Sequence, residues 1–361
     1  MPDGPAGFEF VEEGRILSMG LSSDTRLLTP EEIAVQAGQQ VSFLRLPECP
    51  TVFAERETRL RQLAAGHPMR DYLLFVAELA RAQHEVLLTH PAVALPDAQA
   101  IATASRAGQP PLPATLWTRD AAWRDGLHGL LDRLLPRLAG NPAIGAVQAL
   151  RAADDEWIER QADRLLGSIM VGLDLAAAPL IAAGLQVYWT QLVLATQQAH
   201  GARRLAPFGR TDDPTRCPCC GSRPTASVSR IGADAAGYRY LHCSLCSTQW
   251  HMVRIKCTHC ESTKGIGYQS LVPLPGHDLP ASGAVKDAVQ AETCDECGHY
   301  LKIVHMGRDP HVDPVADDLA SLTLDLLVSE SGHQRHGVNL LLLFGDPEHL
   351  PGGPPPDPGA P

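Results

Sequence analysis

The stretch CPCCGSRPTASVSRIGADAAGYRYLHCSLCSTQWHMVRIKCTHC, residues 217–260, decides how this chain folds. It contains three pairs of cysteines with two residues between the partners, and a fourth such pair follows further along the chain. Nine of the ten cysteines lie between Cys217 and Cys297 of the 361-residue chain, so they form one local cluster. The four pairs are Cys217/Cys220, Cys243/Cys246, Cys257/Cys260 and Cys294/Cys297.

Each pair has the spacing of a metal knuckle. Two intervening residues let both thiolates reach one metal ion at a bond length of about 2.3 Å, while nearby backbone N–H groups point at the sulfur atoms. Gly221 and Gly298 each follow a knuckle, where the turn favours a residue that tolerates a positive φ. A cross-brace, in which the first pair joins the third, fits the spacing as well as sequential pairing. Sequential pairing predicts two tetrathiolate sites, one from Cys217, Cys220, Cys243 and Cys246 and one from Cys257, Cys260, Cys294 and Cys297.

Three kinds of chemistry use cysteine pairs. Structural disulfides need an oxidising compartment, and the N-terminus shows no basic residue before Arg15 and no apolar run behind it, so we expect no export signal and a cytoplasmic protein. Thioredoxin-like redox chemistry needs a single motif on a strand-to-helix turn, which four regularly placed pairs do not match. Closed metal sites fit the pattern best.

A closed tetrathiolate site limits what the protein can do. Because it has no open coordination position, it cannot activate water as a catalytic zinc site does. It can hold a small module together, or cycle one electron if the metal is iron. Zinc and iron both accept four sulfur ligands, so the spacing does not choose between them. The sequence also lacks a Gly-rich phosphate loop, a nucleophile elbow and a His-Glu-x-x-His helix, so we predict that the chain is not an enzyme.

Upstream of the cysteines, the sequence pattern is typical of an α-helical domain. Thr29-Pro30-Glu31-Glu32 combines an N-cap residue, a first-turn proline and a glutamate, which is typical of a helix start. Residues 67–90 carry apolar residues at three- and four-residue spacing, which indicates an amphipathic helix. Residues 109–113 contain three prolines and predict a rigid connection. Further helices of a bundle of about six are expected over 53–65, 119–138, 143–166 and 175–199.

The most apolar stretch, Leu175–Ala195, has about the length of a membrane span. It contains Pro179, Gly184 and two glutamines, and alanine supplies much of its apolar character. We therefore predict a buried core helix and no stable membrane insertion.

Downstream of Pro207 the pattern changes to short segments separated by glycine, proline and serine. Thr225–Arg230 and Tyr238–Leu241 are expected to be short strands. Asp313-Pro314 predicts an N-cap followed by a first-turn proline, opening a helix that runs through Leu327.

The charge of the chain bears on its partners. Thirty Lys and Arg residues stand against 41 Asp and Glu, which gives a net charge of −11. An acidic chain repels phosphate backbones and anionic membrane surfaces, which counts against a nucleic-acid partner. A nucleic-acid-binding zinc ribbon would use the basic residues of the cysteine region, but the overall charge outweighs them. They are Arg223, Arg230, Arg239, Arg254 and Lys256.

Several other side chains crowd the cysteine region. Cys219 is a third thiol inside the first knuckle, either unliganded or an alternative ligand, and Cys49 is expected to be an ordinary buried thiol. Trp250 and Arg254 are expected to pack the two ribbons together. Eight thiolates leave no need for histidine ligands, so five histidines are expected to face solvent or to hydrogen-bond around the sites. They are His242, His251, His259, His299 and His305.

Taken in order, these motifs resemble the FdhE family of formate dehydrogenase accessory proteins. The resemblance rests on Cys217–Pro224, Leu241–Cys246 and Trp250–Cys260, and on Cys294-Asp295-Glu296-Cys297. It extends over nearly the whole chain apart from its ends. Cys219 departs from the pattern, which does not demand cysteine there. Further matching positions are Tyr300-Leu301-Lys302, Asp317-Asp318-Leu319, Gly332, Arg335, Gly337 and Asn339, with His67-Pro68, Tyr72 and Trp123 in the helical half.

The resemblance implies a fold class of α+β, with an N-terminal α-helical domain followed by two rubredoxin-like or zinc-ribbon modules and a C-terminal helix. By similarity, the eight paired cysteines are the metal ligands, with iron favoured and zinc as the alternative. The expected parts are a poorly ordered N-terminus (1–28), the α-helical domain (29–206), a first metal module (207–255), a second metal module (256–312), a C-terminal helix and strand packed on the modules (313–346) and a disordered Pro/Gly tail (347–361).

The resemblance also implies a function. It predicts a non-catalytic, cytoplasmic, chaperone-like factor that contacts the catalytic subunit of formate dehydrogenase during its assembly or maturation. The alternative from the metal sites is a rubredoxin-like electron carrier or a thiol-redox protein, which predicts reversible spectral change and turnover with a donor. The oligomeric state is open, and a homodimer is one option.

Overall fold

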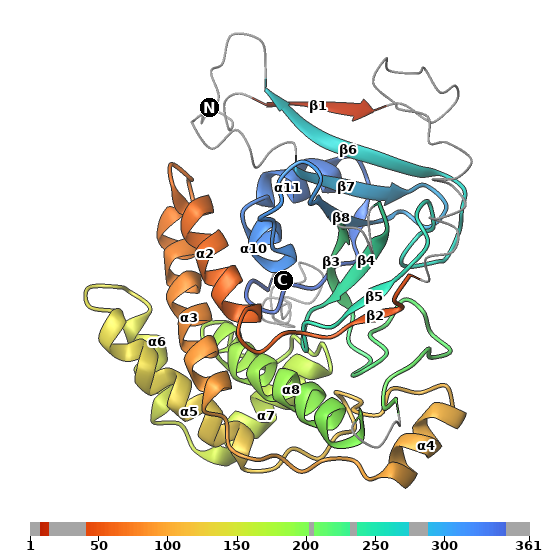
Figure 1. The fold of residues 1–361 in the computed structure, drawn as a ribbon. Helices are drawn as coiled ribbons and strands as arrows, with labels where there is room; N and C mark the ends of the chain where they lie inside the picture. The colour runs from red at the N-terminus through yellow and green to blue at the C-terminus, as the bar shows by residue number, and fades with distance from the viewer. Residues whose placement is uncertain (1–7, 14–40, 202–205, 232–236, 274–287, 344–361) are drawn as a thin grey trace, which may run out of the picture.

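The computed structural model of the chain describes residues 8–13, 41–201, 206–231, 237–273 and 288–343. Helices occupy the first part of this range and a sheet with two short helices occupies the second (Figure 1). The helix start expected at Thr29-Pro30 and the tail at 347–361 lie outside the described residues. Inside the segment 1–28, residues Phe8–Glu13 form strand β1.

The helical half follows the predicted periodicity closely. Its helices are α2 (Val52–Ala64), α3 (Arg70–Leu88), α4 (Ala98–Arg106), α5 (Ala122–Leu134), the 3₁₀ turn η1 (Leu135–Arg137), α6 (Ile144–Arg151), α7 (Asp155–Leu166) and α8 (Ala178–Gly201). The single helix expected over 143–166 is wrong, because the chain breaks between α6 and α7. The carboxylate of Asp154 accepts a hydrogen bond from the Trp157 amide at 2.7 Å, which starts a new helix there. Asp97 likewise caps α4, a helix that the sequence analysis did not predict.

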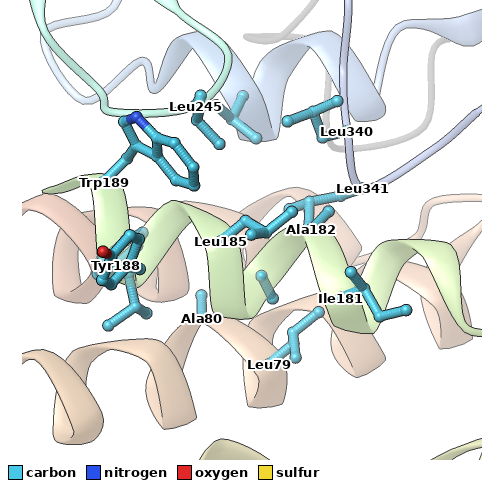
Figure 2. Packing of buried hydrophobic residues seen from close by; sticks show 14 of the residues in the cluster. Leu79, Ala80, Ile181, Ala182, Leu185, Tyr188, Trp189, Leu245, Leu340 and Leu341 are labelled. Atoms are coloured by element: carbon cyan, nitrogen blue, oxygen red, sulfur yellow. The ribbon is translucent and has the colours of Figure 1, made fainter. Parts of the chain in front are cut away.

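Helix α8 lies at the centre of the helical half. By length and composition it is the one helix among the described residues that could cross a membrane, but 78% of its apolar window is buried inside the fold. Figure 2 shows Leu79 and Ala80 of α3 against one side of α8, and Leu245, Leu340 and Leu341 against another. The predicted core helix is confirmed.

The strands of the second half form one sheet within the described residues. Their order is β1-β6-β7-β8-β3-β4-β5-β2, with β9 paired to β8. The bounds are β2 (Leu44–Arg45), β3 (Pro224–Ser229), β4 (Arg239–Cys243), β5 (Gln249–His251), β6 (Ile266–Pro273), β7 (Val289–Cys294), β8 (His299–His305) and β9 (Gln334–Arg335).

The sheet joins the two cysteine ribbons. Strands β3, β4 and β5 carry the first ribbon and β6, β7 and β8 carry the second, both in antiparallel pairs. Strands β3 and β8 then pair in parallel, with Ser227 opposite Ile303. The two ribbons are therefore halves of one continuous surface, with β1 and β2 at its edges.

The C-terminal helix is divided into α10 (Pro314–Leu319) and α11 (Leu322–Glu330). The start is as predicted, because the Asp313 side chain accepts from the amides of Val315 and Ala316. The single helix through Leu327 is wrong. The Ser321 hydroxyl donates to the Asp317 carbonyl at 2.7 Å, a local bond that competes with helix continuation.

Trp250 does not pack the two ribbons together as expected. Trp250 is buried in the same core cluster as the helices, and its indole N–H donates to the Pro214 carbonyl at 2.9 Å. Arg254 donates to the Gly237 carbonyl within the first ribbon, and its positive charge also reaches His305 on β8 of the second. The buried ion pair between Arg239 on β4 and Glu292 on β7 connects the ribbons instead.

Candidate metal centres

The structure brings the eight paired cysteines into two groups of four. In each group all four sulfur atoms lie within 4.8 Å of one another. The groups follow sequence order, so the cross-brace is not the arrangement found here. The first group is Cys217, Cys220, Cys243 and Cys246, and the second is Cys257, Cys260, Cys294 and Cys297.

All four knuckles use the same turn. The residue after the second cysteine has a positive φ. Backbone hydrogen bonds join this residue, or the residue that follows it, to the first cysteine of the knuckle. The glycines Gly221 (74°) and Gly298 (67°) confirm the predicted turn. Ser247 (57°) and Glu261 (61°) take the same conformation without being glycine, which the sequence analysis missed although both occupy the same position after a knuckle. The repeat of the turn shows that all four knuckles have one local geometry.

Backbone hydrogen bonds complete each knuckle. The Gly221 amide donates to the Cys217 carbonyl at 2.7 Å, and the Cys217 amide donates to the Ser222 carbonyl at 3.0 Å. Amides also point at sulfur, as predicted, since the Cys246 amide lies 3.4 Å from the Cys243 sulfur. In the second site the His259 amide lies 3.3 Å from the Cys257 sulfur. These bonds close the turns of the knuckles and orient the Sγ atoms of Cys243 and Cys257.

The spacing of the sulfur atoms fits a tetrahedral metal. A tetrahedron with metal–sulfur bonds of about 2.3 Å has edges of roughly 3.8 Å. In the first group the Sγ–Sγ distances are 3.5 Å for Cys217–Cys246 and 3.4 Å for Cys220–Cys243. In the second group they are 3.7 Å for Cys257–Cys297 and 3.8 Å for Cys260–Cys294. All exceed a disulfide bond, which is about 2.05 Å, so both donor sets could hold a metal ion.

The two groups differ in their surroundings. All four cysteines of the first group are buried, at 0–1% exposure, and they belong to the core cluster that also holds α8. In the second group Cys260 is exposed and Cys297 is half-buried. The first site is therefore an internal part of the fold, and the second lies at the surface.

Burial controls the thiols of the first group. It raises the pKa of Cys217 and of Cys243 well above the usual value for a thiol. Burial also opposes ionisation of Cys246, but hydrogen bonds from Cys217, Cys219 and the other thiols around it hold the pKa of Cys246 well below the usual value. The group therefore holds one thiolate surrounded by thiols. A metal cation that binds there displaces the protons of the remaining thiols.

The first knuckles are attached directly to the helical half. The Leu112 amide donates to the Cys219 carbonyl at 3.0 Å, so the proline-rich connection runs along the first knuckle. On the other side, the buried amide of Gln186 on α8 donates to the Ser244 carbonyl at 2.8 Å, and Gln83 of α3 donates to Gln186. Site geometry and helix packing are therefore linked.

Neither remaining cysteine joins a group of four. Cys219 is buried next to the first site, where the Thr248 hydroxyl lies 3.6 Å from its sulfur. Cys49 is half-buried against the helical core, and burial raises the pKa of its thiol. Both thiols are free in this structure.

The histidines take varied positions. His259 and His299 stack with ring centroids 3.9 Å apart beside the second site, and their nitrogens lie near Cys297. His242 is buried, and its Nδ1 lies 3.4 Å from the Gln249 amide nitrogen. His251 packs edge-on against Tyr238 and Tyr240.

The motif residues after the cysteines build a buried charge network on β8. The Lys302 ammonium lies 2.9 Å from Asp318 and 2.6 Å from Asp325. Arg335 pairs with both carboxylates, and the Asn339 amide donates to Asp318 at 2.8 Å. Burial opposes ionisation of Asp318, but the positive charges of Arg335 and Lys302 hold its pKa below the usual value. The network fastens α10 and α11 to the sheet, which gives these motif residues a structural task.

Comparison with known proteins gives one consistent family. Family models described as FdhE N-terminal, FdhE central domain and FdhE C-terminal domain match residues 41–205, 216–254 and 255–342. A protein named FdhE homolog from Klebsiella pneumoniae subsp. pneumoniae is 37% identical over 313 residues, covering 87% of this chain and 95% of its own. FdhE of Salmonella dublin is 38% identical over 305 residues, covering 84% and 92%.

A solved structure agrees with these relatives. The crystal structure of the FdhE protein from Pseudomonas aeruginosa matches with a TM-score of 0.68 at 38% identity, covering 84% of this chain and all of that chain. The mixed helix and sheet architecture and the order of the motifs are thus those of known proteins. The chain belongs to the FdhE family, the accessory proteins of formate dehydrogenase.

Proposed function

We propose that this chain is a non-catalytic factor for the assembly and maturation of formate dehydrogenase, which binds the catalytic subunit through a scaffold held by two tetracysteine metal sites. The observation that carries the proposal is the pair of four-sulfur groups, each with tetrahedral spacing. Four thiolates fill the coordination shell of a metal, so such a site stabilises a surface and does not activate a substrate.

The first site lies where it can hold the scaffold together. Its knuckles are hydrogen-bonded to the proline-rich connection and to Gln186 of α8. A metal there would cross-link two chain segments that are 29 residues apart at Cys217 and Cys246. Binding free energy of the metal then becomes folding free energy of the surrounding surface.

Iron is the metal we propose for both sites, because the family resemblance favours it. Zinc is the alternative, because four thiolates accept either ion. The metal would supply a cross-link in both cases and a one-electron couple only in the case of iron. Action in the cytoplasm fits this proposal, since reducing conditions keep thiols available for metal.

The test is anaerobic affinity purification from the protein's own host. The tagged wild type, Cys243→Ser and the matched control Cys49→Ser are compared, because Cys49 is a free thiol outside both groups. We expect the wild type and Cys49→Ser to retain metal and to recover the catalytic subunit of formate dehydrogenase, and Cys243→Ser to lose both. A fully metal-loaded wild type that recovers no formate dehydrogenase subunit contradicts the proposal.

One observation favours the electron carrier as a second candidate. Cys260 of the second site is exposed, and an exposed tetrathiolate can exchange electrons with a partner. This candidate requires iron at the second site and a reversible change in its visible absorption under redox titration. Turnover between a donor and an acceptor, abolished by Cys260→Ser, would put it ahead of the assembly role.

A further inference from the structure

One arginine stands between the two tetracysteine sites. Arg223 follows the first knuckle by three residues, and its carbonyl accepts from the Ser244 amide of the second knuckle at 3.2 Å. Its side chain is half-buried and lines a groove together with Ser244 and Leu245, and its positive charge lowers the pKa of both His259 and His336. The guanidinium therefore lies where the two metal ribbons meet.

No carboxylate among the described residues pairs with Arg223. Burial lowers the pKa of its guanidinium, and the neighbouring Arg216 acts in the same direction. The acid next to Arg216 is Asp213, at 3.8 Å, and the Asp213 carboxylate already accepts from the Thr215 amide and hydroxyl. A half-buried guanidinium without a counter-ion is unfavourable, and an incoming carboxylate relieves that cost.

The rings near Arg223 offer it no counter-charge. His336 packs edge-on against His259 at 5.0 Å, and His259 stacks on His299. His336 is buried, His299 is half-buried and His259 is exposed, and none of these three rings carries a negative charge that could neutralise the arginine.

A groove runs from this arginine along the first site. Its volume is about 440 Å³, and the sulfur-bearing residues Cys217 and Cys220 lie in its wall. Leu116, which is 82% exposed, lines it together with other apolar residues. We call this feature the arginine groove and define it by the lining residues Arg216, Arg223, Leu116, Leu166, Pro113 and Val338. Asp212 and Asp213 also line the groove, so an incoming segment must place its negative charge at Arg223.

We propose that the arginine groove binds an extended segment of the formate dehydrogenase catalytic subunit, in which a carboxylate side chain lies next to an apolar one. The carboxylate pairs with the Arg223 guanidinium, whose planar fork suits bidentate contact, and the apolar side chain covers Leu116. The groove admits a few side chains and not a folded domain. This inference rests on the proposed function, because it names the surface by which the client is held.

The test measures affinity between the metal-loaded full chain and the isolated catalytic subunit. We expect Arg223→Glu and Leu116→Asp each to weaken binding about tenfold or more, Arg223→Lys to weaken it less, and added salt to weaken the wild type. Arg70→Glu is the matched control, since Arg70 is 61% exposed at the start of α3 and lines none of the groove. Metal content and melting temperature are measured for every variant.

The outcomes separate the two proposals. Wild-type affinity in an Arg223→Glu protein that keeps its metal and its melting temperature overturns the groove and leaves the assembly function standing. If Arg223→Glu loses metal or unfolds, Leu116→Asp decides, and wild-type affinity there overturns the groove in the same way. A wild type that does not bind the catalytic subunit overturns both proposals.

Discussion

At the scale of single residues, the four knuckles show how one turn is built from different side chains. Gly221 and Gly298 adopt a positive φ without steric cost, whereas Ser247 and Glu261 adopt it with a Cβ present. The left-handed conformation costs an ordinary residue about 1–2 kcal/mol. Two of the four turns therefore hold strain that the surrounding hydrogen bonds offset.

Alanine at the two glycines should have unequal effects. We expect Gly298→Ala to lower the free energy of unfolding by about 1 kcal/mol, because a Cβ there meets nothing within 4 Å and only the backbone is strained. Gly221→Ala should cost more, since its Cβ would lie 3.3 Å from Pro110 Cγ. Denaturant unfolding of the metal-loaded proteins measures both. Ser247→Gly is the converse variant and should be neutral or stabilising; a clear loss of stability there would refute the strain argument.

His305, on β8, makes the stability of the protein depend on pH. Burial lowers its pKa to about 4, and Arg308 and Arg254 act in the same direction. The unfolded chain has a histidine pKa near 6.5, so it binds a proton that the folded chain excludes. The contribution of neutral His305 is complete above pH 6.5 and is lost as the pH falls toward 4, on the order of 1–3 kcal/mol.

The measurement is unfolding free energy against pH for the wild type and His305→Gln at equal metal content. Glutamine does not titrate, so the variant should lose less stability between pH 6.5 and 4. Parallel curves for the two proteins would show that His305 is not the group responsible.

At the scale of elements, the charge network on β8 holds α10, α11 and β9 in place. Lys302 comes from β8, Asp318 from α10, Asp325 from α11 and Arg335 from β9. Removing one member leaves an excess buried charge, whereas removing an opposite pair keeps the balance. Breaking one partner of a buried pair typically costs about 3–5 kcal/mol.

A double-mutant cycle tests this account. We expect Asp318→Ala to destabilise the protein by about 3–5 kcal/mol, because Lys302 and Arg335 then share one carboxylate. The double variant Lys302→Met with Asp318→Ala should be more stable than Asp318→Ala alone, since Arg335 and Asp325 remain paired. A double variant that loses the sum of both single effects would mean that the charges act independently.

Elements with local signals were predictable from the sequence, and those with distant partners were not. The apolar periodicity of 67–90 predicts α3, and the Asp313-Pro314 helix start predicts α10. The break before α7 depends on one hydrogen bond from Trp157 to Asp154, a small signal inside a helical pattern. The parallel pairing of Ser227 with Ile303 has no local signal, which is why one sheet was taken for two separate modules.

At the scale of the whole molecule, the two four-cysteine groups lie in different environments within one sheet. The first is in the core beside α8, and the second is at the surface, with Cys260 exposed. The four knuckles and the turns at Gly221 and Gly298 were predictable from the sequence, because knuckle spacing is local, but the choice between sequential pairing and a cross-brace was not. The difference in burial was not predictable either, because burial of Cys217 and Cys246 depends on the packing of helices far away in the chain.

Metal should leave the two sites at different rates. We expect a chelator to remove metal first from the second group, because solvent reaches Cys260 while the first group is 0–1% exposed. Alkylation of the partly depleted protein, read by peptide mass spectrometry with metal analysis, should label Cys260 and Cys297 before Cys217 and Cys243. Equal labelling of both groups at half-depletion would contradict the expected order.

The parallel contact between β3 and β8 also constrains how the protein is made (Figure 1). During synthesis the first ribbon emerges long before β8, so the edge of β3 waits unpaired while the second ribbon is translated. Unpaired strand edges attract other chains. This accessory protein thus passes through a vulnerable interval of its own on the ribosome, one that ends when the last long strand of its sheet arrives.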